Sequence, residues 1–313
     1  MEESTPKPTL AQLKEQPHYS YSALNTYINT CQLLYYYRYI EKAEAERTPV
    51  ALPFGSAFHC VLSEQAQAAK TGKLMTAEEM TEAFATYFQA NCKDAANIAF
   101  KRDENIDDQI ATAKRMFEVV NREWIDYWNI ESVAEPFKVE MPGLSKPLIG
   151  ELDMVVSVQT PFDSESDKMA DSIVDFKTAA RMWSDDRPAK DLQATVFSYA
   201  FEKVHGRRPV SFRFDVVTKT KTPAVKHLYT SRDDGHYQRL EKLFLTADRG
   251  IQAGVFLPNE SSYACVDCPY ADRCSGWHLQ APGLQKNTDT NPTNTISQGE
   301  NDNEGLHTHL HSA

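Results

Sequence analysis

The order in which hydrophobic periodicity changes along the chain constrains the fold more than any other feature of the sequence. Apolar residues recur with helical spacing through most of the first 135 residues, and strand-like alternation begins only after them. From there the pattern predicts strands at 136–141, 148–158, 171–177, 210–218 and 224–230, and helices at 186–205 and 233–252. Helices followed by the order β-β-β-α-β-β-α indicate an α/β or α+β core with a mixed sheet.

Local signals mark the ends of several elements. Pro142-Gly143 predicts a hairpin turn, and the helix at 186–205 should end at Gly206. A helix expected soon after residue 18 should carry Cys31 on its apolar face, so that this thiol points inward. We therefore divide the chain into a polar leader at 1–18, one domain at 19–279 with a helical insertion at 64–135, and an acidic tail at 280–313. The tail is poor in apolar residues, which predicts disorder.

Composition narrows the class of protein. The chain has 313 residues, of which 41% are hydrophobic, and this is enough for a buried core. Its start does not resemble a signal peptide, and no apolar run approaches the roughly 20 residues of a membrane span, which indicates a soluble, cytoplasmic protein. The net charge of −11 argues against a general polyanion binder, but it leaves room for an enzyme with a local basic groove. Short basic clusters occur at 181–190, 207–208 and 219–226.

Two predicted strands carry the residues with the strongest chemical signal. Asp175 and Lys177 alternate on one strand and should share a face, while Phe176 between them should point into the core. Asp153 ends the segment Gly-Glu-Leu-Asp on a neighbouring strand. Carboxylates and a lysine placed together can hold a divalent cation and orient a water for phosphodiester hydrolysis. The Asp-x-Lys pattern alone also occurs by chance on exposed strands.

Four motifs in order resemble the PD-(D/E)XK nuclease superfamily, specifically its RecB-like branch. They are FGSAFH ending at His59, the segment ending at Asp153, Ile-Val-Asp-Phe-Lys-Thr around Asp175 and Lys177, and Gln193 in the following helix. The resemblance implies a restriction-endonuclease-like α/β core.

The resemblance also implies roles for these residues. His59, Asp153, Asp175 and the carbonyl of Phe176 would ligate Mg²⁺ or Mn²⁺. Lys177 would orient or help deprotonate the attacking water, and Gln193 would position the lysine or the DNA. The chain departs from the branch four residues after Gln193, where Phe197 stands in place of a tyrosine. Tyr199 lies about 120° away from Gln193 round the helix, which puts in doubt any contribution of its hydroxyl to the site.

The cysteines predict a second site. Cys265, Cys268 and Cys274 lie within ten residues, a spacing typical of metal or cluster ligation, and Cys31 is the natural fourth ligand. From spacing alone zinc and an iron–sulfur cluster are both open. One early and three late cysteines resemble the iron–sulfur RecB-like nucleases, including the CRISPR-associated exonucleases and AddB-type nuclease domains, and this likeness favours a structural 4Fe–4S cluster. Cys60 and Cys92 fit no such spacing and are interpreted as buried free thiols.

The resulting hypothesis is a metal-dependent DNA exonuclease that acts on single strands or duplex ends in recombination, repair or replication. A helicase or a single-strand-binding or annealing protein is the expected partner, and a viral source acting in a host cell is one interpretation. Phe117, Trp124 and Trp128 are either stacking residues for a threaded strand or, more often for such aromatics, helix core. The alternatives are a structure-specific endonuclease, a catalytically silent DNA- or helicase-binding nuclease fold, and a zinc-stabilised interaction protein.

Overall fold

Alternating apolar residues between 130 and 230 form one mixed sheet in the computed structural model, which describes residues 7–94, 97–101, 103–124, 129–159 and 169–279. The strand order is β3-β4-β5-β6-β7. The strands are β3 (Ile130–Val139), β4 (Leu148–Gln159), β5 (Met169–Ala179), β6 (Ser211–Thr218) and β7 (Val225–Thr230). The pair β5 and β6 is parallel and the other neighbouring pairs are antiparallel. The predicted mixed sheet is confirmed.

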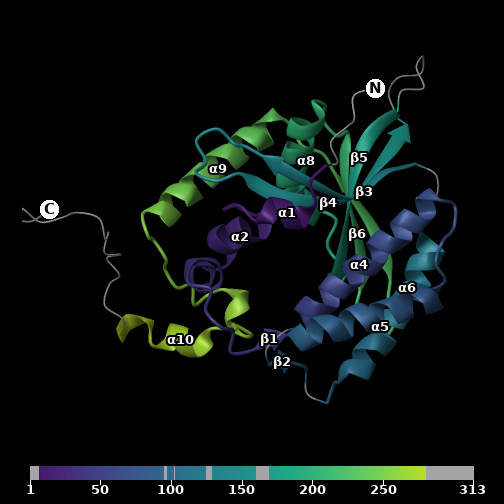
Figure 1. Ribbon diagram of the computed structural model, residues 1–313, viewed down its shortest axis with the longest axis horizontal. Coiled ribbons are helices and arrows are strands. Elements are labelled where there is room, and N and C mark those ends of the chain that lie inside the picture. The colour runs from purple at the N-terminus through teal and green to yellow at the C-terminus, as the bar shows by residue number, and fades with distance from the viewer. Residues whose placement is uncertain (1–6, 95–96, 102, 125–128, 160–168, 280–313) are drawn as a thin grey trace, which may run out of the picture. The chain divides into compact units, whose positions relative to one another are not determined.

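Helices cover both faces of this sheet, as Figure 1 shows. One face packs against α2 (Tyr21–Asn25), α8 (Leu192–His205) and α9 (Asp234–Gln252), and the other against α4 (Ala51–Lys70), α5 (Ala77–Asp94) and α6 (Ile106–Glu123). Successive residues of β5 therefore enter different cores: Ile173 joins the cluster with α8, and Val174 joins the cluster with α4. The α/β fold with flanking helices is confirmed.

The N-terminal helical region is interrupted where one continuous helix was expected. After α1 (Leu10–Lys14) and α2 come the π-helical η1 (Thr26–Thr30), then α3 (Gln32–Tyr35) and the π-helical η2 (Tyr36–Ile40). Cys31 has extended backbone angles, with φ −165° and ψ 126°, and is half-buried. The prediction that Cys31 lies on the apolar face of a helix is wrong. The reason is tertiary, because the N–H of Leu33 bonds to Leu257 O at 3.1 Å in the C-terminal segment.

The expected helical insertion at 64–135 ends earlier than predicted, because β3 already begins at Ile130. Within it, the short strand β2 (Ile98–Ala99) pairs in parallel with β1 (Thr48–Pro49), just before α4. Phe117 is fully buried and Trp124 nearly so, both in the core between α4, α6 and the sheet. The interpretation of Phe117 and Trp124 as core residues is therefore confirmed, and the stacking role is wrong for both. Trp128 lies outside the described residues.

The predicted helix at 186–205 consists of two helices. α7 (Arg187–Lys190) ends at Asp191, whose extended backbone starts α8. Gly206 ends α8 in the left-handed conformation, with φ 69°, as its position predicted. The crossover formed by α7 and α8 is what allows β5 and β6 to run in parallel.

The C-terminal part of the domain contains three short helices: η3 (Tyr263–Cys265), α10 (Ala271–Ser275) and η4 (Trp277–Leu279). The predicted tail at 280–313 lies outside the described residues, as do residues 1–6 of the predicted leader. Among the helices that the structure describes, none combines the length and apolar character needed to cross a membrane.

Candidate active site

The site forms where β4 and β5 stop pairing. Their register ends at the pair Met154 and Val174. One residue beyond, the Asp153 carboxylate accepts a hydrogen bond from the N–H of Phe176 at 2.9 Å. The side chain of Asp153 thus satisfies a main-chain donor on β5 that the ladder no longer reaches. This hydrogen bond holds a half-buried carboxylate between the ends of the two strands.

The helix α4 brings His59 to the same point. Its Nδ1 lies 3.3 Å from Oδ2 of Asp153. One helical turn earlier, Gly55 faces β5, and a Cβ added there would lie 4.0 Å from Oγ1 of Thr178. That distance is an ordinary contact, so packing alone does not require a glycine at this position. The Gly-x-x-x-His spacing nevertheless marks the part of α4 that faces the strand ends.

Asp175 and Lys177 share a face of β5, as their alternation predicted. Lys177 Nζ lies 2.5 Å from Oδ2 of Asp175, and Gln193 Nε2 on α8 donates to Oδ1 of Asp175 at 2.7 Å. Asp175 is only 1% exposed. The structure therefore brings together the side chains of His59, Asp153, Asp175, Lys177 and Gln193, which come from two strands and two helices.

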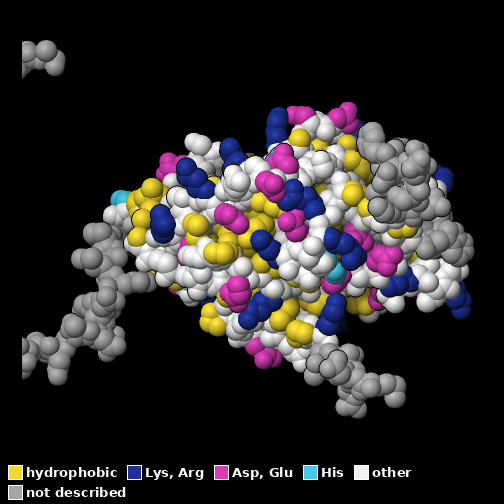
Figure 2. Space-filling model, turned by 90° about the horizontal axis from the view of Figure 1, so that it is seen from above, with side chains coloured by type: hydrophobic (Ala, Val, Ile, Leu, Met, Phe, Trp, Pro, Cys, Tyr) yellow, Lys and Arg dark blue, Asp and Glu magenta, His cyan; other side chains and the backbone are white. Residues whose placement is uncertain are grey.

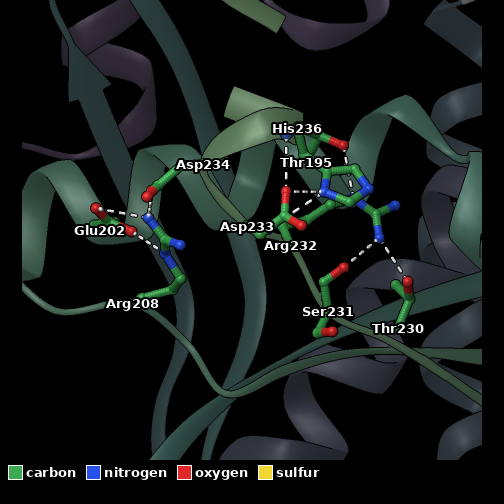
Figure 3. A network of polar contacts seen from close by, with 9 residues as sticks. All are labelled: Thr195, Glu202, Arg208, Thr230, Ser231, Arg232, Asp233, Asp234 and His236. Atoms are coloured by element: carbon green, nitrogen blue, oxygen red, sulfur yellow. Dashed lines mark hydrogen bonds and ion pairs between the residues drawn. The ribbon is translucent and has the colours of Figure 1, made fainter. Parts of the chain in front are cut away.

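The start of α8 is fixed by residues that the sequence analysis did not single out. Asp191 caps the helix by accepting a hydrogen bond from the N–H of Gln193 at 2.9 Å. The buried Arg232 donates to the carbonyls of Pro188 and Asp191 at 2.8 and 2.9 Å, and to Oγ1 of Thr195 at 2.7 Å. Figure 3 shows Arg232 between Thr195, Thr230 and Ser231. An N-cap signal was present at Asp191, but no sequence pattern marks Arg232.

Burial and neighbouring charges shift the titration of the site. Burial raises the pKa of Asp175 to about 6, against the lowering effect of Lys177. Burial acts in the same direction on Asp153, but the charges of His59 and Lys177 outweigh it and hold its pKa below the usual range. Burial lowers the pKa of Lys177, and the two carboxylates more than reverse this. Opposite charges thus stabilise the ionised forms of Asp153 and Lys177, whereas at Asp175 the effect of burial prevails.

The donor set fits a divalent cation. Two carboxylates and an imidazole lie together, and Oδ2 of Asp175 is buried without a hydrogen bond of normal geometry despite the nearby ammonium of Lys177. As these side chains stand, the described part of the chain contains no group of three or more His, Cys, Asp or Glu arranged around one metal position. His59 and Asp153 instead contact each other. The unsatisfied oxygen of Asp175 is the feature that a cation would complete.

Two tyrosines differ in their relation to the site. Tyr199 donates from its hydroxyl to Glu241 Oε1 on α9 at 3.1 Å, so it does not serve the site, in agreement with its helical position. Tyr21 on α2 packs edge-on against Phe197 with ring centres 6.1 Å apart. Burial, followed by the charges of Asp191 and Asp175, raises the pKa of Tyr21. Tyr21 thus packs on α8, the helix that carries Gln193, which no sequence signal indicated.

The four predicted cluster cysteines line one pocket of about 30 Å³. Cys31 Sγ accepts from the N–H of Asn259 at 3.4 Å, and Cys265 Sγ donates to the carbonyl of the same residue at 3.3 Å. Burial raises the pKa of Cys268 and of Cys274. Cys60 and Cys92, half-buried on α4 and α5, do not line this pocket.

Comparisons with known proteins agree with this geometry. A model of the PD-(D/E)XK nuclease superfamily matches residues 18–275. A crystal structure from Eubacterium rectale, described as "Putative exonuclease", is similar with a TM-score of 0.53 and 13% identity, covering 84% of this chain and 91% of that one. A second crystal structure, that of SSO0001, has a TM-score of 0.31 and 11% identity, and it covers 81% of this chain and 94% of that one. At such identity the likeness shows the fold alone. No curated protein matches the chain.

Proposed function

Because this chain belongs to the PD-(D/E)XK nuclease superfamily, we propose that it is a DNA exonuclease that uses Mg²⁺ or Mn²⁺ to hydrolyse phosphodiester bonds. Its substrates are single strands or duplex ends. The observation that carries the proposal is the convergence of Asp153, Asp175 and Lys177 at the diverging ends of β4 and β5. Exonucleolytic cleavage is the first mode to test, because the similar structure from Eubacterium rectale is described as "Putative exonuclease".

The cation would be held by His59, Asp153, Asp175 and the carbonyl of Phe176. An imidazole ligand suits Mn²⁺ better than Mg²⁺, which prefers oxygen. When bound, the cation would supply Lewis acidity toward a phosphoryl oxygen and the attacking water.

The remaining groups position the reactants. The amide of Gln193 holds one oxygen of Asp175, which leaves the other oxygen to Lys177 and the cation. The ammonium of Lys177 is restrained by its contact with Asp175 and would orient the attacking water through its N–H groups. Arg232 acts at a distance, because it fixes the helix start that presents Gln193.

For the cysteine pocket we propose a structural 4Fe–4S cluster bound by Cys31, Cys265, Cys268 and Cys274, which would place the chain in the iron–sulfur RecB-like branch. The proposal is supported by the position of all four thiols around one pocket and by the preference of iron–sulfur clusters for thiolates. Zinc is the alternative metal, and the colour of the purified protein separates the two, because zinc thiolate sites are colourless.

The proposed process is DNA recombination, repair or replication in the cytoplasm, with a helicase or a single-strand-binding or annealing protein as partner. These assignments follow from the nuclease hypothesis, and identification of proteins that co-purify with the full chain would test them.

The test is cleavage of end-labelled single-stranded, linear duplex and circular DNA with Mg²⁺, Mn²⁺ or EDTA. An exonuclease degrades linear substrates with either cation, leaves covalently closed circles intact and is inactive in EDTA. Cleavage of circles or of junctions at internal positions would instead assign a structure-specific endonuclease. Binding of DNA without cleavage under every condition would favour the catalytically silent fold.

A further inference from the structure

Half of the eight basic residues in the clusters found in the sequence form ion pairs with acidic neighbours. Lys190 pairs with Asp186, Arg207 with Asp171, Arg208 with Glu202 and Lys226 with Asp185. On the face seen in Figure 2, lysine and arginine side chains are likewise interspersed with aspartate and glutamate. An acidic chain of this kind needs local sites, not a broad basic field, to hold a polyanion.

Four cluster residues form no ion pair with a described residue, and Lys219 differs from the other three because it is half-buried, whereas Arg181, Arg187 and Lys221 are exposed. It follows β6, where its N–H donates to the carbonyl of Ala179 at 2.8 Å. Its Nζ lies 4.7 Å from the centre of the ring of Phe54, which is fully buried on α4. The ammonium therefore rests on an aromatic face, with no carboxylate to compensate for its loss of water.

A second cation without an ion pair in the described residues follows β2, the strand that pairs with β1 just before α4, the helix of Phe54. This cation is the exposed Lys101. Burial, and after it the positive charge of Lys101, lowers the pKa of Lys219. Like charges on Lys219 and Lys101, with Lys219 partly desolvated, are unfavourable in the free protein. An anion bound between them would remove this repulsion.

The position of the pair relates it to the candidate active site. Ala179, which anchors the main chain of Lys219, lies two residues beyond Lys177 on β5. Phe54, whose ring contacts the ammonium of Lys219, precedes His59 by five residues on α4, about 7.5 Å along the helix axis. Ala179 and Phe54 thus lie on β5 and α4, the two elements that also carry Asp175 and His59. Both residues are displaced from those ligands toward the C-terminal end of β5.

We infer that Lys219 and Lys101 bind a backbone phosphate of the DNA next to the phosphate that is cleaved. The inference rests on the proposed nuclease function and adds to it a binding site outside the metal cluster. It identifies the ligand as one phosphate of a nucleic acid strand, shared by two ammonium groups.

The test measures binding of a fluorescein-labelled single-stranded oligonucleotide by fluorescence anisotropy in a cleavage-deficient Asp175→Asn background, with Mg²⁺ present and salt varied. Lys219→Met keeps the length of the side chain and removes the charge, and it should weaken binding about tenfold. Because both lysines contact one phosphate, the Lys101→Met/Lys219→Met variant should lower the salt slope by about 0.7, not by about 1.4. Lys226→Met, which removes a lysine already paired with Asp185, should bind within about twofold of the background protein.

Thermal unfolding of the free protein separates this role from a structural one. Lys219→Met removes a partly buried charge without a counter-ion, so its melting temperature should stay equal or rise. If Lys219 serves only to cover Phe54, the melting temperature should fall while DNA affinity and the salt slope stay unchanged, and the inference is overturned. The outcomes also stay distinct from the nuclease proposal. Cleavage by the wild type with unaltered affinity in Lys219→Met rejects only the phosphate site, whereas absence of cleavage by the wild type rejects the proposed function.

Discussion

The candidate active site and the cysteine pocket are built in opposite ways. In the active site each charged side chain already has a partner within the protein, and Asp175 is held by both Lys177 and Gln193. The cysteine pocket is surrounded by short helices, and large apolar side chains beside it are exposed, with Tyr263 at 83% and Val266 at 78%. The first arrangement is held together by contacts between its own side chains. The second, we expect, depends for its stability on bonds made through the thiols.

The largest expected effect is on catalysis. Asp175→Asn and Lys177→Met should each reduce DNA cleavage by at least about 10²-fold while circular dichroism and gel filtration stay close to wild type. Both side chains are proposed for the chemistry, and both replacements keep side-chain size. Asp185→Asn is the matched control, because this exposed carboxylate pairs with Lys226 away from the cluster. Wild-type rates for either site variant, in preparations free of contaminating nuclease, would show that the reaction occurs elsewhere.

The next effect should be on stability and should come from the cysteine pocket. Cys31→Ser should be as damaging as Cys268→Ser, with loss of brown colour, loss of iron and a destabilisation on the order of 4 kcal/mol, as for a cross-link that closes a long loop. Iron analysis and thermal unfolding measure this.

Cys60→Ser and Cys92→Ser are the controls, since these thiols do not line the pocket. They should retain iron even if the half-buried serine hydroxyl costs about 1 kcal/mol. Iron retained in Cys31→Ser but lost in Cys60→Ser would refute the ligand assignment. If wild-type protein purified without oxygen contains stoichiometric zinc and no iron, the four-cysteine site is retained in the proposal and its metal is zinc instead of a 4Fe–4S cluster.

A smaller effect on stability should come from the hydrogen bonds of Asp248, which link the N-terminal region to α9. The buried Asp248 accepts from the hydroxyl of Tyr19 at 2.6 Å, from the hydroxyl of Ser145 at 2.6 Å and from the N–H of Ser145 at 2.9 Å. Burial raises the pKa of Asp248, but these hydrogen bonds outweigh it and hold the pKa below its usual range. Asp248→Asn should therefore cost about 1–3 kcal/mol at neutral pH.

The pH dependence gives the sign of this contribution. A carboxyl group whose pKa is lowered by folding stabilises the protein above its unfolded pKa of about 4, and this stabilisation is lost as the pH falls through the lower folded pKa. The difference in unfolding free energy between wild type and Asp248→Asn should shrink over that acidic range. Ser275→Ala, at an exposed position, is the control. A difference that is independent of pH would assign the effect to packing and not to the charge.

The smallest effect should come from removing residues 281–313. Their composition predicts no packed structure, so truncation should change the unfolding free energy by less than about 0.5 kcal/mol and leave basal cleavage unchanged. Differential scanning calorimetry and the cleavage assay measure both. A clear drop in melting temperature would show that this segment packs on the domain, and loss of a partner interaction alone would assign it a docking role.

Prediction from the sequence succeeded for the strands, because the two-residue alternation of apolar and polar side chains is a local pattern. Alternation placed the five strands and put Asp175 and Lys177 on one face with Phe176 in the core, because side chains of a strand alternate regardless of what surrounds it. Prediction failed at Cys31 and at Asp191. At both positions apolar spacing indicates a continuous helix, yet the backbone is extended.

The sequence by itself therefore determined the α/β class, the strand content and the residue types of the site, because these depend on local periodicity and side-chain chemistry. Only the tertiary structure decided how they meet. Pairing of β4 and β5 ends at Met154 and Val174, and this lets Asp153 reach the main chain of Phe176. Arg232, more than 40 residues beyond Pro188 in the sequence, fixes the start of α8. Such contacts join segments that are distant in the chain, and their free energy depends on a geometry that no local pattern encodes.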